Sequence, residues 1–125
     1  MKISKEEISF DYSKINLSNL ETVIEYAIEL KKQIGEITRI KYLGTNYTSG
    51  NCLPKIFSNF KEYDIILPRS DSERRKLAAV LFILARHTKC RAEVEYIDPH
   101  NKNTISFKHR KSKISKLQRE LESIL

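Results

Sequence analysis

The chain has 125 residues, a length typical of a single domain, which we place at residues 1–125. Hydrophobic residues make up 40% and charged residues 31%, a balance that excludes a disordered tail or a membrane protein. The longest uncharged apolar run, Leu77 to Ala85, is much shorter than the ~20 residues of a membrane-spanning helix, so we expect no membrane partner. The amino terminus becomes acidic at Glu6 before any apolar stretch develops, so we expect no signal peptide and a cytoplasmic location.

The excess positive charge lies almost entirely in the second half of the chain. The net charge is +7, and residues 1–62 contribute +1 of it, from nine basic and eight acidic residues. Residues 63–125 contribute +6, from fourteen basic and eight acidic residues. This asymmetry favours an acidic partner, which is either a nucleic acid (DNA or RNA) or an acidic protein surface.

The first part of the chain predicts a strand followed by a helix. Apolar and polar residues alternate over Ile8–Tyr12, which is typical of a half-buried strand. A helix then opens at residues 17–21, where Ser18 and Glu21 have the spacing of a capping box. Gly35 is placed to end this helix in a left-handed conformation.

The middle of the chain predicts a second strand over Ile37–Leu43, then a loop over residues 44–51. Residues 52–62 are ambiguous, and a short helical turn after Pro54 is our interpretation of them. A third strand is predicted over Tyr63–Leu67.

The last third begins with a helix over Asp71–Thr88, where Ser70 and Glu73 repeat the capping-box spacing. Its centre is apolar all the way round, which predicts the main core helix or part of a subunit interface. The remaining predicted elements are a strand over Arg91–Ile97, a turn over residues 98–103, a strand over Thr104–Lys108, and a final amphipathic helix over Ser112–Ile124.

This order predicts an α+β fold. Two β-α-β units in succession give the β-α-β-β-α-β arrangement of a ferredoxin-like sandwich. A C-terminal hairpin strand and a helix would extend it. Right-handed crossovers would place both central helices on one face of the sheet.

Basic residues form the strongest functional signal. One group begins where the last strand meets the last helix, where backbone amides at a helix start also favour anions. A second group surrounds the end of the central helix. A third, Arg74 to Lys76, lies near the start of that helix. We predict nucleic-acid contact by the first two groups, which contain Lys108, Arg110, Lys111, Lys113, Lys116 and Arg119, together with Arg86, Lys89 and Arg91.

Stacking of bases would require exposed aromatic side chains beside this charge. The candidates are Phe10 and Tyr12 on the first predicted strand, Tyr47 in the loop, and Tyr63 on the third strand.

Signals for catalysis are weak. The sequence has no glycine-rich phosphate loop and no metalloprotease or nucleophile-elbow motif. Its two cysteines, Cys52 and Cys90, are too few for a disulfide framework or a four-cysteine zinc site, and we expect reduced thiols, no metal and no cofactor. The only enzyme candidates are His100 in the predicted turn and the pair Glu93 and Glu95.

Three functions remain open from the sequence. The first is a non-enzymatic nucleic-acid-binding domain that contacts mainly phosphates. The second is a protein-interaction or assembly module, either a homo-oligomer such as a homodimer or an accessory subunit. The third is a small metal-dependent nuclease.

Overall fold

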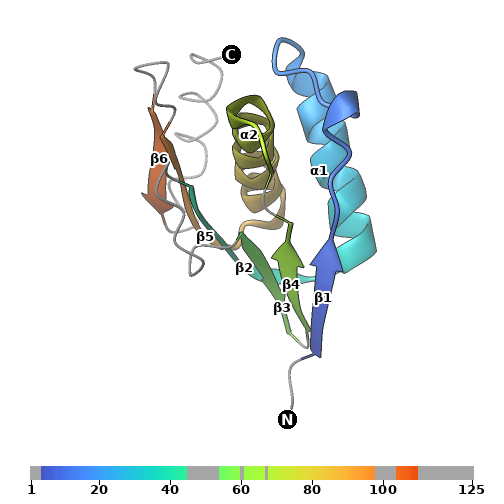
Figure 1. Ribbon diagram of the computed structural model, residues 1–125. Coiled ribbons are helices and arrows are strands. Elements are labelled where there is room, and N and C mark those ends of the chain that lie inside the picture. Colours follow the sequence, from blue (N-terminus) through green and yellow to red (C-terminus); the bar gives the residue numbers. More distant parts are fainter. Residues whose placement is uncertain (1–3, 45–53, 60, 67, 98–103, 110–125) are drawn as a thin grey trace.

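The computed structural model describes residues 4–44, 54–59, 61–66, 68–97 and 104–109 (Figure 1). Two long helices and one sheet make up this part of the chain. The elements in order are β1 (Ser4–Ile8), a 3₁₀ turn η1 (Tyr12–Lys14), α1 (Leu20–Ile34), β2 (Ile37–Gly44), β3 (Lys55–Ser58), β4 (Lys61–Ile65), α2 (Asp71–Thr88), β5 (Arg91–Ile97) and β6 (Thr104–His109).

The six strands form one mixed sheet in the order β1-β4-β3-β2-β5-β6. β1 pairs with β4 and β2 pairs with β5 in parallel, whereas the other neighbours are antiparallel. The connection from β1 through α1 to β2 therefore passes over β4 and β3, and the one from β4 through α2 to β5 passes over β3 and β2. Both helices lie on the same face of the sheet and pack against each other (Figure 1).

The α+β class is confirmed, but the strand order differs from the predicted ferredoxin-like arrangement. A further strand, β3, lies between the two β-α-β units and forms a hairpin with β4. Each crossover thus spans two strands of the sheet. The predicted C-terminal helix over residues 112–124 lies outside the described residues.

The sequence misplaced the first strand and missed the third. β1 covers Ser4–Ile8, so the alternating apolar and polar residues over Ile8–Tyr12 do not form a strand beyond Ile8. The apolar positions there are aromatic residues of a loop that packs on the core. Phe10 stacks on Tyr12 and on Tyr26 of α1, with ring centroids 5.9 and 5.6 Å apart, and packs into the core from a loop. Residues 55–58 form β3 instead of a helical turn. Charged positions in both strands obscured the apolar pattern of a sheet.

Helix ends follow local sequence chemistry, with one correction. Asn19, and not Ser18, caps α1, because its side-chain oxygen accepts a hydrogen bond of 3.1 Å from the Glu21 amide. Gly35 ends α1 as predicted, but its φ of +86° and ψ of −134° lie outside the left-handed helical region that the sequence suggested. Ser70 caps α2 by accepting a hydrogen bond of 3.1 Å from the Glu73 amide.

The centre of α2 is the core of the protein. Every residue from Leu77 to Ala85 is at most 1% exposed, so the whole circumference of the helix is enclosed within this single chain. The strands contribute Ile40, Tyr42, Ile56 and Val94 beneath it. An interface with a second copy through these α2 residues would need them to be accessible, and they are not.

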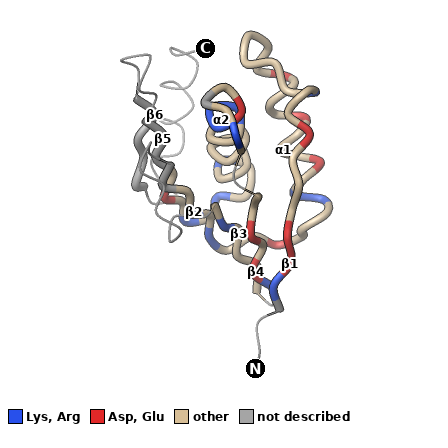
Figure 2. Tube along the Cα trace, in the orientation of Figure 1, with Lys and Arg blue, Asp and Glu red and all other residues tan. Residues whose placement is uncertain are grey.

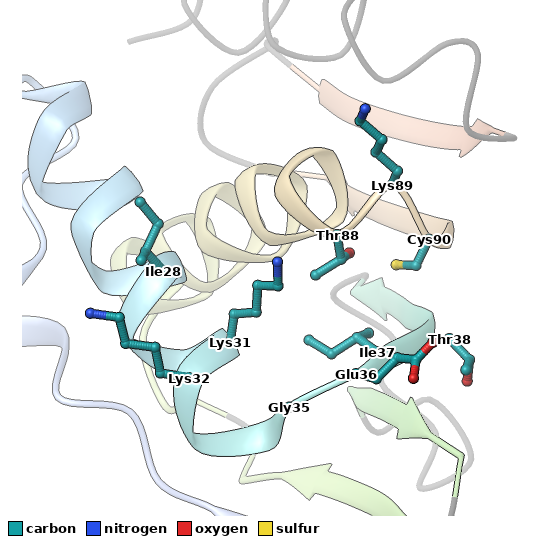
Figure 3. A pocket seen from close by; sticks show the side chains of 10 residues that line it. All are labelled: Ile28, Lys31, Lys32, Gly35, Glu36, Ile37, Thr38, Thr88, Lys89 and Cys90. Atoms are coloured by element: carbon teal, nitrogen blue, oxygen red, sulfur yellow. The ribbon is translucent and has the colours of Figure 1, made fainter.

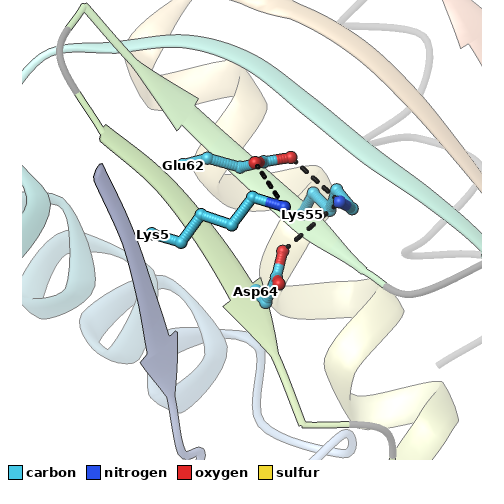
Figure 4. Close-up of polar contacts among 4 residues, drawn as sticks. All are labelled: Lys5, Lys55, Glu62 and Asp64. Carbon is cyan, nitrogen blue, oxygen red and sulfur yellow. Dashed lines mark hydrogen bonds and ion pairs between the residues drawn. The ribbon is translucent and has the colours of Figure 1, made fainter. Parts of the chain in front are cut away.

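The opposite face of the sheet is charged rather than apolar (Figure 4). Lys55 on β3 donates a hydrogen bond of 2.9 Å to Glu62 on β4 and lies 3.5 Å from the carboxylate of Asp64. Lys5 on β1 reaches the other oxygen of Glu62 at 3.7 Å. This network joins side chains of β1, β3 and β4, whose backbones are paired in the sheet.

Candidate nucleic-acid interface

Basic side chains gather where both helices end and where β2 and β5 begin. α1 and α2 run downward side by side in the view of Figure 1 and end above the lower parts of β1, β3 and β4, and acidic positions lie higher on α1 (Figures 1 and 2). We call this surface the basic end. It consists of Lys31 and Lys32 in the last turn of α1, Arg86 in the last turn of α2, Lys89 at its C-cap, and Arg91 at the start of β5.

The cations of the basic end form no ion pair with any described side chain, although Glu36 lines the same groove as Lys31, Lys32 and Lys89. No carboxylate of a described residue lies within 4.0 Å of any of the five. The nearby Glu36 instead accepts a hydrogen bond of 3.3 Å from the side chain of Asn59. Helix dipoles explain part of the clustering, since cations are favourable in a last helical turn. They do not explain Arg91, which lies beyond the helix.

A groove opens between the two helix ends (Figure 3). Its volume is about 720 Å³, within the range of small-molecule sites. Lys31 extends toward the end of α2, whereas Lys32 and Lys89 extend outward (Figure 3). The groove is lined by Ile28, Lys31, Lys32, Gly35, Glu36, Ile37, Thr38, Thr88, Lys89 and Cys90.

His87 reports the electrostatic potential of this region. Its pKa is lowered below the usual 6.5, first because the ring is partly desolvated, and then because the cations Arg86 and Lys31 repel a proton. Arg86 belongs to α2 itself and Lys31 reaches across from α1. The charges of two helices therefore act at one place.

The structure brings together the predicted residues that it describes. Arg86, Lys89 and Arg91 lie within one short segment, and the register of the last hairpin adds Lys108. β6 pairs Lys108 with Glu93 and His109 with Ala92, so the end of β6 lies beside the start of β5. The other predicted contact residues, Arg110, Lys111, Lys113, Lys116 and Arg119, lie outside the described residues.

Sequence reasoning missed Lys31 and Lys32. They stand in the first half of the chain, where the net charge is nearly balanced. Their only signal is a pair of adjacent lysines in the last turn of a predicted helix. Parallel packing of α1 and α2 is what places them beside Arg86.

The third basic group lies elsewhere and has structural roles. It is about 16 Å from Arg86 along α2, at 1.5 Å per residue. The Arg74 guanidinium donates a hydrogen bond of 3.1 Å to the Pro68 carbonyl, and the Lys76 ammonium donates one of 3.1 Å to the Tyr12 carbonyl. These bonds fix the segments that lead into α1 and α2.

The predicted stacking residues are not available as a platform. Phe10 and Tyr63 are 8% and 7% exposed and belong to the core, and Tyr12 is half-buried. Tyr47 lies outside the described residues. An aromatic ring that the sequence did not single out, Phe57 on β3, lies beneath the Arg39 guanidinium at 5.6 Å from the ring centroid.

The described residues provide no catalytic constellation. Glu93 forms an ion pair of 3.6 Å with Arg39, and the Cys90 thiol is buried. The side chain of Glu95 and all of His100 lie outside the described part. Within that part, no three His, Cys, Asp or Glu side chains are grouped to hold a metal ion, and neither helix is long and apolar enough to cross a membrane.

Comparison with known proteins gives no further guide. The chain matches no protein-family model, no curated protein and no solved structure. The clearest functional feature of the described residues is therefore the basic end, where Lys31, Lys32 and Lys89 line a groove and Arg86 and Arg91 flank Lys89 in the chain.

Proposed function

We propose that this protein binds nucleic acid through the phosphates, using the basic end as its contact surface. The observation that carries the proposal is the convergence of Lys31, Lys32, Arg86, Lys89 and Arg91 at one end of the molecule, without a described carboxylate within 4.0 Å. Elsewhere, basic side chains such as Lys5, Lys55 and Lys61 are paired with acids.

Phosphates are the chemistry that such a surface fits. Long, flexible lysine and arginine side chains neutralise phosphates and release counterions, which supplies most sequence-independent affinity. Readout of bases would require side chains aimed at base edges, and cations on helix ends carry no such information. The proposed binding is therefore strong at low salt and nearly independent of sequence.

The test is the salt dependence of oligonucleotide binding, measured by fluorescence anisotropy. If each of the five cations neutralises one phosphate of a single strand, the slope of log K against log salt is about −3.5, at about −0.7 per phosphate. Changing Arg86, Lys89 and Arg91 together to Ala should reduce the slope to about −1.4.

A matched control removes the same net charge from another surface. Lys5, Lys14 and Lys61 form exposed ion pairs away from the basic end, so changing all three to Ala costs little stability. We expect this triple variant to retain most of the slope. Equal losses in the two triple variants would show that only net charge matters, and would refute the proposed surface.

A further inference from the structure

We infer that the groove between the helix ends receives one unstacked nucleotide of a single strand. The base would lie against the apolar part of the groove, and a phosphate would meet the ammonium of Lys31. This inference rests on the proposed function and names its substrate class as single-stranded nucleic acid.

The exposed apolar side chain of the groove is Ile28, one turn before Lys31 on α1, which is partly exposed. Ile37 at the start of β2 and Cys90 just before β5 also line the groove, but they are only 5% and 3% exposed. No aromatic ring of a described residue lines the groove, so a base would gain from removal of apolar surface from water and not from stacking. This contact is open to any base.

The charged side chains that line the groove are Lys31, Lys32, Lys89 and Glu36, and the two hydroxyls of the groove are engaged by main-chain carbonyls. The Thr88 hydroxyl donates a hydrogen bond of 2.9 Å to the Leu84 carbonyl, and the Thr38 hydroxyl donates one of 3.2 Å to the Phe57 carbonyl. Glu36 is held by Asn59. Lys31 is the inward cation, with no described carboxylate within 4.0 Å, and it extends across the groove (Figure 3). A ligand with a flat apolar body and one anionic group would match the partly exposed Ile28 and the ammonium of Lys31.

The cations around the groove favour a polymer over a free nucleotide. Lys32 and Lys89 lie on its two sides and extend outward, away from the space that Lys31 enters (Figure 3). Phosphates before and after the bound nucleotide would pass close to them. A free nucleotide would leave both without a contact.

A single strand satisfies this geometry more easily than a duplex. A paired base is stacked between its neighbours, and its removal costs a few kcal/mol before it can enter any pocket. A single strand has already lost the pairing. At equal length and salt, the duplex should therefore bind through its phosphates alone.

The experiment compares three probes by anisotropy or calorimetry: a 12-nucleotide single strand, the duplex of the same length, and a free nucleoside monophosphate. Ile28→Trp fills the groove without changing charge, and Lys31→Met removes the inward charge but keeps an apolar stem. Gln33→Trp, exposed on α1 outside this groove, is the matched control. Circular dichroism checks that each variant is folded.

We expect the parent to prefer the single strand, and both groove variants to lose about tenfold in single-strand affinity. Ile28→Trp should leave duplex binding nearly unchanged, whereas Lys31→Met should cost the duplex only the one phosphate contact of Lys31. Equal parent affinities for single strand and duplex, or unchanged single-strand binding by Ile28→Trp and Lys31→Met, would overturn the inference. A free nucleotide that binds as tightly as the strand would also overturn it. Binding of no probe would instead refute the proposed function itself.

Discussion

The burial of α2 makes a quantitative prediction about where this protein gets its stability. Leu81 is 0% exposed, within a stretch from Leu77 to Ala85 in which no residue exceeds 1%. Leu81→Ala removes apolar atoms and leaves a cavity, which costs about 3 kcal/mol at a well-packed site. With an m-value of about 2 kcal/mol per molar urea, the denaturation midpoint should fall by about 1.5 M.

Urea denaturation followed by circular dichroism measures this shift. Ile66→Ala is the control, since Ile66 is 56% exposed and its replacement should change the free energy of unfolding by less than about 0.5 kcal/mol. The measurement is repeated over a wide range of protein concentration. A loss below about 1 kcal/mol for Leu81→Ala, or one that disappears at high concentration, would refute the assignment of α2 as an intramolecular core.

Other predictions concern charge and helix ends. The pKa of His87 is lower in the folded protein than in the unfolded chain, so the unfolded chain takes up a proton first as the pH falls. The free energy of unfolding should therefore decrease as the pH is lowered past about 6.5, and this decrease should be smaller in His87→Gln. A bound oligonucleotide should raise this pKa, as NMR of the imidazole protons would show. Lys55 lowers the pKa of Glu62, so Glu62→Gln should cost about 1 kcal/mol at neutral pH and less in acid, as urea titrations would show. In thermal unfolding, Gly35→Ala should lower the free energy of unfolding by about 1–3 kcal/mol, because alanine is strained at the positive φ of this position. Ser70→Ala should lower it by about 1 kcal/mol, because the cap of α2 is lost.

Both helices could be predicted from the sequence because their signals are local. The bounds of α2, Asp71–Thr88, agree with the apolar run and with the Ser70 cap. Gly35 marks the end of α1 because few other residues adopt its backbone conformation. β5 follows from simple alternation between its two faces.

The edge of the sheet was harder to predict. β1 and β3 are short and carry charged residues that are satisfied by partners distant in sequence, as when Lys5 meets Glu62. No window of consecutive residues contains that information. Missing β3 also hid the direction of β4, because the β3–β4 hairpin reverses the chain once more and makes β4 parallel to β1.

The charge asymmetry, the core helix and three of the five cations at the basic end follow from the order of residues alone. Helix packing adds Lys31 and Lys32 to these cations and directs Arg74 and Lys76 to main-chain carbonyls elsewhere. The physical reason is that charge acts through space, whereas the sequence orders residues along a line. Two parallel crossovers bring both helix ends to one place, and the buried stretch of α2 from Leu77 to Ala85 separates its two basic groups.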